Sequence, residues 1–196
     1  MIEKYRMAAR LHSQSIDQGF LSSLGTRFLS LMYQAIDEAD NSTLIVASEG
    51  GKIIGFVSGT LGIGEVYRAM LKHRIGLAVA LLPSLFSLRR VRRILEIAFY
   101  GRRKARKNPE AGPEVPDAEL LSISVDGAYR GKKHSDRLFQ DLVGFFRSKN
   151  IPRFKIIVGA SLAPAHSFYR RMGAKPAGTT EVHKGEISTI YIYEVN

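Results

Sequence analysis

The stretch Glu119–Asn150, ELLSISVDGAYRGKKHSDRLFQDLVGFFRSKN, decides the fold that the sequence predicts. Its opening residues, ELLSISV, form an apolar and β-branched run, which is typical of a strand that is at least half buried. DGAYRGKK then predicts a basic loop rich in turn residues. The residues that follow place leucine and phenylalanine at helical spacing, with Ser135 or Asp136 as the expected helix cap. Because IPRFKIIVG at 151–159 begins another buried strand, the stretch predicts a β-loop-α-β unit.

The loop of this unit carries its positive charge directly into the start of the helix. Backbone N–H groups are free at that end and the helix dipole is positive there, so the geometry suits an anion. The alternative interpretation is that residues 130–134 form a solvated basic loop on an unrelated βαβ unit.

At these residues the chain resembles the cofactor-binding motif of the GNAT superfamily of N-acetyltransferases, which take an acetyl group from acetyl-CoA. Ser135 is small enough for the last place of the family's loop signature, but Lys133 stands where the family has a glycine. A Cβ at that place is expected to crowd the pyrophosphate or to force a different backbone angle. The Lys133 ammonium can compensate by reaching a phosphate. The residues that match the motif are Val125, Tyr129, Arg130 and Gly131.

A second stretch, SLAPAHSFYRRMGAKPAG at 161–178, resembles another family motif, Asn-x-x-Ala-x-x-x-Tyr followed by Gly-Phe. Leu162 replaces the asparagine and Ala174 replaces the phenylalanine. The glycine of the motif suits the C-terminal cap of a helix. The residues that match in spacing are Ala165, Tyr169 and Gly173.

The resemblance implies an α/β (α+β) fold with a GNAT-like mixed, mostly antiparallel central sheet, helices on both faces and a splayed parallel strand pair. A single N-acetyltransferase domain is expected over 1–196, because this length suits one domain with a full core. A basic helical insertion at about 61–118 departs from a minimal acetyltransferase.

Outside these motifs, the sequence predicts a short first strand over 2–8 and a helix over 19–39 capped by Ser22 or Ser23. LIVA and IIGFV flank the turn at 49–52 and predict a hairpin, with Glu49 solvated at its tip. EVHKGEISTIYIYEV predicts the closing strands.

The insertion predicts two or three helices with a break at Pro83, and its uncharged run 75–88 is too short to span a membrane. Residues 89–107 contain nine basic residues against the single acid Glu96. The insertion is compatible with a helical lid, a homodimer contact, or contact of 89–107 with a peripheral membrane surface or an anionic ligand. A packed helical hairpin with a solvated basic face is the remaining interpretation.

The net charge of +11 is concentrated in that segment, so the sequence predicts a local basic element and no nucleic-acid partner. The chain has no cysteine, which excludes disulfides, thiolate catalysis and thiolate metal ligands. No metal is expected. The first residues lack the apolar stretch of a signal peptide, and a cytoplasmic location is expected.

The resemblance implies that the loop binds the pyrophosphate of acetyl-CoA and that the first strand of the unit pairs with its pantetheine arm. Backbone pairing of that kind leaves little trace in side-chain identity. A backbone N–H near Val125 is expected to polarise the thioester carbonyl. The cofactor-binding candidates are Ile123, Ser124, Val125, Arg130, Gly131, Lys132, Lys133, His134, Ser135 and Asp136.

Direct attack by an amine requires a base, a stabilised oxyanion and an acid for the leaving thiolate. Tyr169 is the expected general acid, because a phenol pKa of about 10 is close to that of a thiol; the alternative is that it only packs against the cofactor. Glu119 is a candidate base acting through water. His12, His134 and His166 also have a suitable intrinsic pKa, so the base is left open.

In the resembled family the first helices form a wall of the acceptor site, which makes Phe20 and Ser22 substrate candidates. Phe20 can equally hold its helix to the core. The expected function is transfer of acetyl to a primary amine of a small molecule, and the basic insertion makes a nucleotide-linked amino-sugar one candidate acceptor. The alternatives are a non-catalytic acyl-CoA-binding sensor module and a protein N-acetyltransferase.

Overall fold

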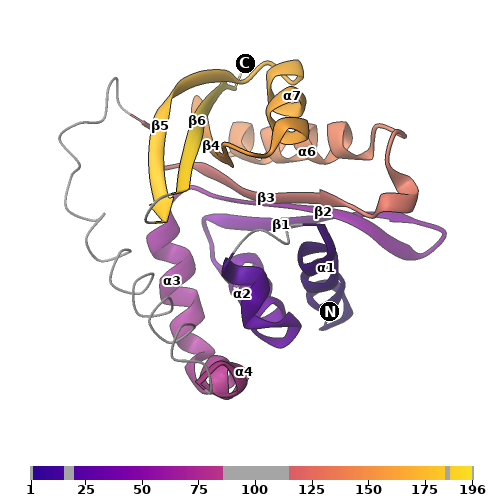
Figure 1. Ribbon diagram of the computed structural model, residues 1–196, viewed down its shortest axis with the longest axis vertical. Coiled ribbons are helices and arrows are strands. Elements are labelled where there is room, and N and C mark those ends of the chain that lie inside the picture. Colours follow the sequence, from indigo (N-terminus) through magenta and orange to yellow (C-terminus); the bar gives the residue numbers. More distant parts are fainter. Residues whose placement is uncertain (1, 16–19, 86–114, 184–185, 196) are drawn as a thin grey trace.

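The computed structural model describes residues 2–15, 20–85, 115–183 and 186–195 (Figure 1). In these residues a single mixed sheet has the strand order β1-β2-β3-β4-β6-β5. The strands are β1 (Ser42–Glu49), β2 (Lys52–Thr60), β3 (Glu119–Val125), β4 (Arg153–Gly159), β5 (Lys175–His183) and β6 (Glu186–Glu194). The helices are α1 (Ile2–Ser15), η1 (Phe20–Leu24), α2 (Thr26–Glu38), α3 (Ile63–Lys72), α4 (Arg74–Leu85), η2 (Gly127–Tyr129), α6 (His134–Ser148) and α7 (Ala163–Arg171).

The sheet separates two layers of helices, with α1 and α2 on one face and α6 and α7 on the other (Figure 1). Each layer has its own core. On the α1–α2 face, Tyr33 and Phe56 are fully buried and their rings meet edge to face at 5.0 Å. On the α6 face, Phe146 stacks on Phe154 at 4.5 Å. The predicted α/β class with a mostly antiparallel sheet and helices on both faces is confirmed.

The N-terminal segment is a helix, so the strand predicted over 2–8 is wrong. Tyr5, Ala8, Ala9 and His12 are buried at helical spacing and pack against α2 and the sheet. The helical spacing of buried residues extends over the whole of α1. Within the seven residues 2–8 alone, this spacing cannot be distinguished from the alternating pattern of a strand.

The helix predicted over 19–39 is divided by Gly25, which has φ 88°. η1 precedes this glycine and α2 follows it, and α2 has no side-chain cap, so the expected cap by Ser22 or Ser23 is wrong. The predicted hairpin is confirmed as β1 and β2. Gly50 and Gly51 both have positive φ in its turn, the conformation that a tight hairpin requires.

β3 and β4 are parallel, and they separate soon after they begin. Their register contains only Glu119↔Lys155 and Leu120↔Ile156. The ladder between β2 and β3 also shifts between Ser58 and Gly59, so β3 bulges as it leaves β4. We call residues 121–125 of β3 and 157–159 of β4 the β3–β4 fork. The splayed parallel pair expected from the sequence is therefore present.

α6 packs tightly on the sheet beside this fork. Leu138, Phe139 and Leu142 are almost fully buried. A Cβ on Gly59 of β2 would lie 2.6 Å from the Leu142 Cδ1, so glycine allows the close approach of helix and strand. The helix therefore holds its N-terminus at a fixed place next to the end of β3.

α7 ends as the sequence predicts. Gly173 has φ 96°, its N–H donates to the Arg170 carbonyl, and the Ala174 N–H donates to the Tyr169 carbonyl. This pattern is a Schellman cap, in which glycine tolerates the left-handed conformation.

The described part of the insertion is α3 and α4, and α4 packs on α2 and η1. The break predicted at Pro83 is wrong, because α4 continues to Leu85; a proline removes one helical hydrogen bond and need not end a helix. The basic segment 89–107 lies outside the described residues. Among those described, no helix is long and apolar enough to cross a membrane.

Candidate functional site

The loop between β3 and α6 presents free backbone amides. The Asp126 carboxylate accepts a hydrogen bond from the Ala128 N–H at 3.0 Å and closes the first turn. Gly131 (φ 80°) and Lys133 (φ 61°) then turn the chain into α6 through the left-handed region. The cap expected from Ser135 or Asp136 is wrong: Lys133 is the N-cap, and no side chain bonds the amides of the first turn. Those amides are therefore available to an anion.

Lys133 shows why a glycine is usual at this place. A residue with a Cβ in the left-handed conformation costs about 1–2 kcal/mol. The sequence predicts that Lys133 forces a different backbone angle or crowds a ligand, and the structure has it in the left-handed region. The lysine thus adopts the glycine-like angle at an energetic cost.

Cations and the Glu49 carboxylate lie around the loop. The ammonium groups of Lys52 and Lys132 lie 5.7 Å and 5.2 Å from the centre of the Tyr129 ring. Glu49 is exposed at the hairpin tip, as expected, and its carboxylate also approaches the loop: it lies 3.6 Å from Lys132 Nζ and 3.2 Å from His134 Nε2. That His134 nitrogen is buried and makes no hydrogen bond to the described residues. Sequence spacing could not identify Glu49, because the hairpin tip and the loop meet only in the folded chain.

Asp136 joins α6 to α7. Its carboxylate accepts hydrogen bonds from both terminal nitrogens of Arg171, at 2.7 Å and 2.8 Å. These hydrogen bonds lower the pKa of Asp136 below its ordinary value. Arg171 therefore neutralises the one carboxylate in the first turn of α6, which would otherwise repel an anion.

The side of β3 that faces the β3–β4 fork offers backbone groups that do not pair with β4. The Asp126 N–H donates to the Ile54 carbonyl at 2.8 Å, so Asp126 and Ile54 are a hydrogen-bonded pair of the ladder. This pair shows which residues of β3 direct their backbone N–H and C=O groups toward β2. Because bonded and non-bonded pairs alternate in an antiparallel ladder, the backbone of Ser124 is used in pairing with β2. The N–H and C=O groups of Ile123 and Val125 face the β3–β4 fork instead. An extended ligand arm can pair with these two residues but not with the backbone of Ser124.

Tyr169 of α7 lies in the core on the α6 face, where Ile123 and Val125 also pack. It is 6% exposed, and its ring lies 6.3 Å from Phe139 and 6.4 Å from Tyr191 between centroids. Burial raises the pKa of the phenol above its ordinary value, so the hydroxyl is protonated at neutral pH.

Glu119 begins β3 at the end away from the loop, roughly 20 Å along the strand from Val125 at 3.3 Å per residue. Its carboxylate lies 3.6 Å from Lys155 Nζ, which also donates to the Pro116 carbonyl at 2.7 Å. Tyr67 of α3 is nearby: burial first, and then the charge of Glu119, raise the pKa of that phenol. Glu119 is thus an ion-paired carboxylate. It lies at the end of β3 where β3 and β4 are still paired, and the loop follows the opposite end of the strand.

Two of the histidine candidates are engaged in structural contacts. His166 Nδ1 lies 2.9 Å from the Tyr191 hydroxyl and Nε2 lies 3.1 Å from the Gly159 carbonyl, so both ring nitrogens are used. His12 is 3% exposed, and its Nδ1 lies 2.5 Å from the Tyr33 hydroxyl. Burial lowers the pKa of His12 to about 4, so this imidazole is neutral.

The His12–Tyr33 pair belongs to a polar group beneath β3 that the sequence did not indicate. A side-chain hydrogen bond joins Ser122 of β3 to the Tyr33 hydroxyl. The hydroxyls of Ser58 and Ser124 are buried and find no partner in the described part of the chain. Ser58 of β2 and Ser122 and Ser124 of β3 point to the same face of the sheet. This shared face follows from the register between the two strands and could not be predicted without it.

The substrate candidates come from the segment that precedes α2. Phe20 and Ser22 belong to η1, and their side chains lie outside what the structure describes. A hollow of about 520 Å³ lies along the start of α6; it is lined by Lys133, Asp136, Arg137, Gln140, Asp141 and Met172. In the described ranges, no cluster of three or more His, Asp or Glu side chains could hold a metal ion.

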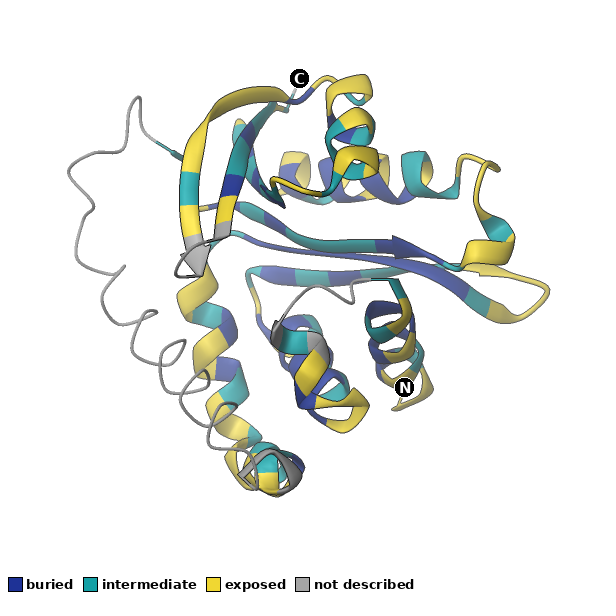
Figure 2. Cartoon of the chain, viewed as in Figure 1, coloured by how far each residue is buried: buried dark blue, intermediate teal, exposed yellow. Residues whose placement is uncertain are grey.

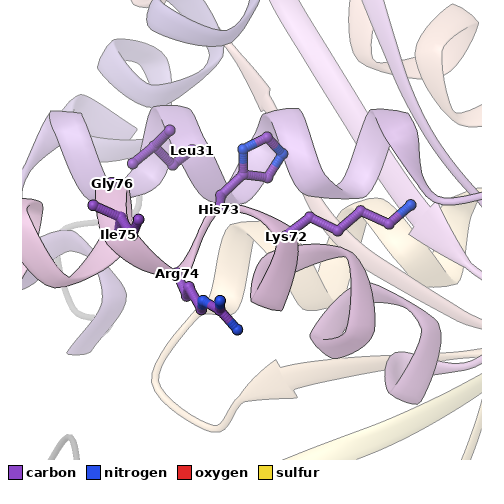
Figure 3. A pocket seen from close by; sticks show the side chains of 6 residues that line it. All are labelled: Leu31, Lys72, His73, Arg74, Ile75 and Gly76. Carbon is purple, nitrogen blue, oxygen red and sulfur yellow. The ribbon is translucent and has the colours of Figure 1, made fainter.

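A second hollow of about 550 Å³ lies at the corner between α3 and α4 (Figure 3). It contains none of the residues predicted for cofactor, catalysis or substrate. Its lining residues are Leu31, Lys72, His73, Arg74, Ile75 and Gly76.

Comparisons with known proteins agree with this arrangement. A family model described as "Acetyltransferase (GNAT) family" matches residues 13–174. No curated protein sequence matches the chain closely enough to count as a relative.

Solved structures show the same fold at low identity. An N-acetyltransferase from Staphylococcus aureus Mu50 superposes with a TM-score of 0.63 at 18% identity, covering 98% of this chain and 97% of that one. Ard1 from Thermoplasma volcanium gives 0.60 at 11% identity, with 100% and 94% coverage. A putative streptothricin acetyltransferase from Bacillus anthracis str. Ames, in complex with acetyl coenzyme A, gives 0.52 at 16% identity, with 83% and 67% coverage.

Proposed function

The chain belongs to the GNAT family of acetyltransferases, and from this premise we propose that it transfers acetyl from acetyl-CoA to a primary amine of a small molecule by direct attack. The observation that carries the proposal is the β3–β4 fork with a basic, uncapped helix N-terminus at its end. The fork offers unpaired backbone groups for an extended arm, and the helix N-terminus offers amides for its phosphates.

In the proposed complex, the pyrophosphate accepts hydrogen bonds from the amides of Gly131–Ser135. Lys132 and Lys133 add charge, because both side chains are exposed beside the loop. The pantetheine arm pairs with the backbone of Ile123 and Val125, which face the fork. Asp136 contributes through its backbone, since its carboxylate is held by Arg171.

The chemistry then requires no covalent enzyme intermediate. The amine nitrogen attacks the thioester carbon, and a backbone N–H of the β3 edge stabilises the developing oxyanion. As the C–S bond breaks, Tyr169 donates its proton to the sulfur. Burial raises the pKa of Tyr169, but the same apolar surroundings disfavour a thiolate, so the proton transfer stays matched.

For the base we propose Glu119 acting through water, since His134 belongs to the loop that is proposed to bind the phosphates. His12 and His166 are engaged by Tyr33, Tyr191 and Gly159. The Glu119 carboxylate lies 3.6 Å from Lys155 Nζ, and in the proposed mechanism it takes the amine proton through a water molecule.

Replacement of the tyrosine tests the proposed acid. Tyr169→Phe should lower kcat by about 100-fold or more while the KM for acetyl-CoA changes little, because only transition-state stabilisation is lost. Tyr193→Phe, another tyrosine of the same buried cluster, is the matched control and should keep its turnover. Equal turnover of Tyr169→Phe and the wild type in a thiol-release assay would rule out the acid role.

The acceptor is tested separately. Thiol release should be measured over a panel of amines that contains nucleotide-linked amino-sugars, polyamines and peptides with free N-termini. Preference for the amino-sugars would support the proposed small-molecule acceptor. Preference for peptides would instead assign the chain to protein N-acetylation.

A further inference from the structure

Exposed apolar side chains are concentrated on α3 and α4. Leu71, Ile75 and Leu82 are 66%, 76% and 53% exposed. Among large hydrophobic residues of the described chain, only Ile2 and Ile187 are exposed elsewhere. The apolar stripe, as we call it, consists of Ile63, Tyr67, Leu71, Ile75, Val79 and Leu82.

The spacing of the apolar stripe places its members on one side of each helix. Residues 63, 67 and 71 follow one another by four positions on α3, and 75, 79 and 82 by four and three positions on α4. Figure 2 shows exposed residues along both of these helices. Scattered single apolar residues need no explanation, but exposed apolar side chains that recur at helical spacing on two neighbouring helices point to an interaction surface.

α4 is apolar on its inner side as well. Leu77, Ala80 and Leu81 pack into the core with α2, while Ile75 and Val79 face solvent. After Arg74 the helix contains no charged residue. A helix that is apolar all round is normally covered on all sides, and within 2–15, 20–85, 115–183 and 186–195 the outer face of α4 stays exposed, so that face is expected to have a partner.

Basic side chains accompany the apolar stripe. Lys72 and Arg74 are exposed where α3 meets α4, and Arg68 lies one turn before Lys72. The single acid of the two helices, Glu65, is already paired with Arg68. At this corner lies the hollow of about 550 Å³, and Figure 3 shows Lys72 and Arg74 extending away from Leu31 beside it.

We propose that the apolar stripe, together with Lys72 and Arg74, docks the protein on the surface of an anionic lipid membrane. Apolar side chains beside cations match the chemistry of the headgroup boundary, where apolar groups enter and cations remain at the phosphates. A second copy of the chain is the poorer occupant, because a symmetric contact would bring the same cations together. The protein lies on the surface, since no described helix is long enough to cross it.

Vesicle sedimentation with the full chain tests this proposal. Vesicles of phosphatidylglycerol and phosphatidylcholine in equal parts should bind the protein, and added salt should weaken that binding. Vesicles of phosphatidylcholine alone should bind it far less. Each cation near an anionic surface contributes about fivefold to partitioning, so K72Q/R74Q should lose roughly 25-fold.

Matched variants separate the apolar stripe from exposed apolar area in general. I75S/V79S/L82S should lose vesicle binding by at least about tenfold, whereas I2S/I187S, which removes exposed isoleucines elsewhere, should bind as the wild type does. Tyr67 is left unchanged because it lies beside Glu119. Both variants should retain acetyl transfer in solution, which distinguishes failure of docking from failure of the enzyme.

A fluorescent reporter checks the depth of contact. The chain has no tryptophan, so V79W provides a single probe whose emission should shift to the blue on anionic vesicles, while I2W should not shift. Three results would overturn the proposal: no binding to anionic vesicles, unchanged binding of I75S/V79S/L82S, or a change in self-association instead of vesicle binding. Unchanged binding would assign membrane contact to another basic segment, such as 89–107.

Discussion

At the scale of single residues, Lys133 combines a strained backbone with a useful charge. Its φ of 61° places a Cβ in the left-handed region, while its exposed side chain adds a positive charge at the N-terminus of α6. The two effects oppose each other: the backbone favours glycine and the phosphates favour lysine.

Lys133→Gly should therefore stabilise the fold and weaken cofactor binding. Relief of the left-handed strain exceeds the added entropy of glycine in the unfolded chain by about 0.5–1 kcal/mol. At this chain length the gain corresponds to an increase in Tm of roughly 1–4 °C. Thermal unfolding measures the first effect and calorimetric titration with acetyl-CoA the second.

Lys133→Ala is the control for this substitution, because it removes the charge but keeps a Cβ. It should lose affinity for acetyl-CoA without gaining stability. If alanine and glycine stabilise equally, the backbone angle is not the source of the strain.

His12 makes stability depend on pH. Burial lowers its pKa in the folded protein to about 4, whereas in the unfolded chain the value is about 6.5. As the pH falls, the unfolded chain therefore binds a proton at His12 before the folded protein does. The contribution of His12 to the free energy of unfolding is complete above pH 6.5 and is lost as the pH falls toward 4. The loss should reach on the order of 3 kcal/mol.

Urea unfolding between pH 7 and pH 4 measures this contribution as a difference between wild type and His12→Gln. The glutamine variant should start less stable and lose less stability on acidification, since it has no imidazole to protonate. Parallel pH profiles for the two proteins would contradict the assignment.

At the scale of elements, the contact between α6 and α7 protects the anion site. Arg171 of α7 holds the Asp136 carboxylate of α6 through two hydrogen bonds. The same contact fixes α7, and with it Tyr169, against the helix whose N-terminus is proposed to receive the phosphates.

Arg171→Gln should raise the KM for acetyl-CoA about tenfold, equivalent to about 1.4 kcal/mol, because Asp136 would then repel the phosphates. Arg170→Gln, which changes the exposed neighbour on α7, is the control and should leave the KM unchanged. The double variant D136N/R171Q removes both charges and should recover most of the affinity. A double variant as weak as Arg171→Gln would show that the ion pair acts by positioning α7 and not by neutralising the carboxylate.

At the scale of the whole molecule, cofactor binding should couple the sheet to the helices. The proposed ligand contacts β3, the loop and α6 together, so it binds the folded state alone. At acetyl-CoA concentrations of about 100 times Kd, the protein should gain about 2.7 kcal/mol and its Tm should rise by roughly 5–10 °C. NAD, another adenine nucleotide with a pyrophosphate, is the matched control ligand and should produce no comparable shift in a thermal unfolding assay. Equal shifts with the two ligands would mean that the site recognises only a pyrophosphate.

The sequence by itself determined the parts of this protein whose cause is local. The β3-loop-α6 unit, the β1–β2 hairpin and the glycine cap of α7 each follow from apolar period and turn chemistry within a few residues. The same local rules were wrong for residues 2–8, where the window was short, and for Pro83, where a helix continues through a proline.

Only the tertiary structure decided which distant residues meet. Glu49 reaches Lys132 and His134 because the hairpin tip lies beside the loop, and Arg171 reaches Asp136 because the end of α7 meets the start of α6. The unpaired edge of β3 likewise depends on a register with β4 that ends after its first residues. Such contacts are set by strand register and helix packing between segments far apart in the chain, and no local pattern of residues specifies them.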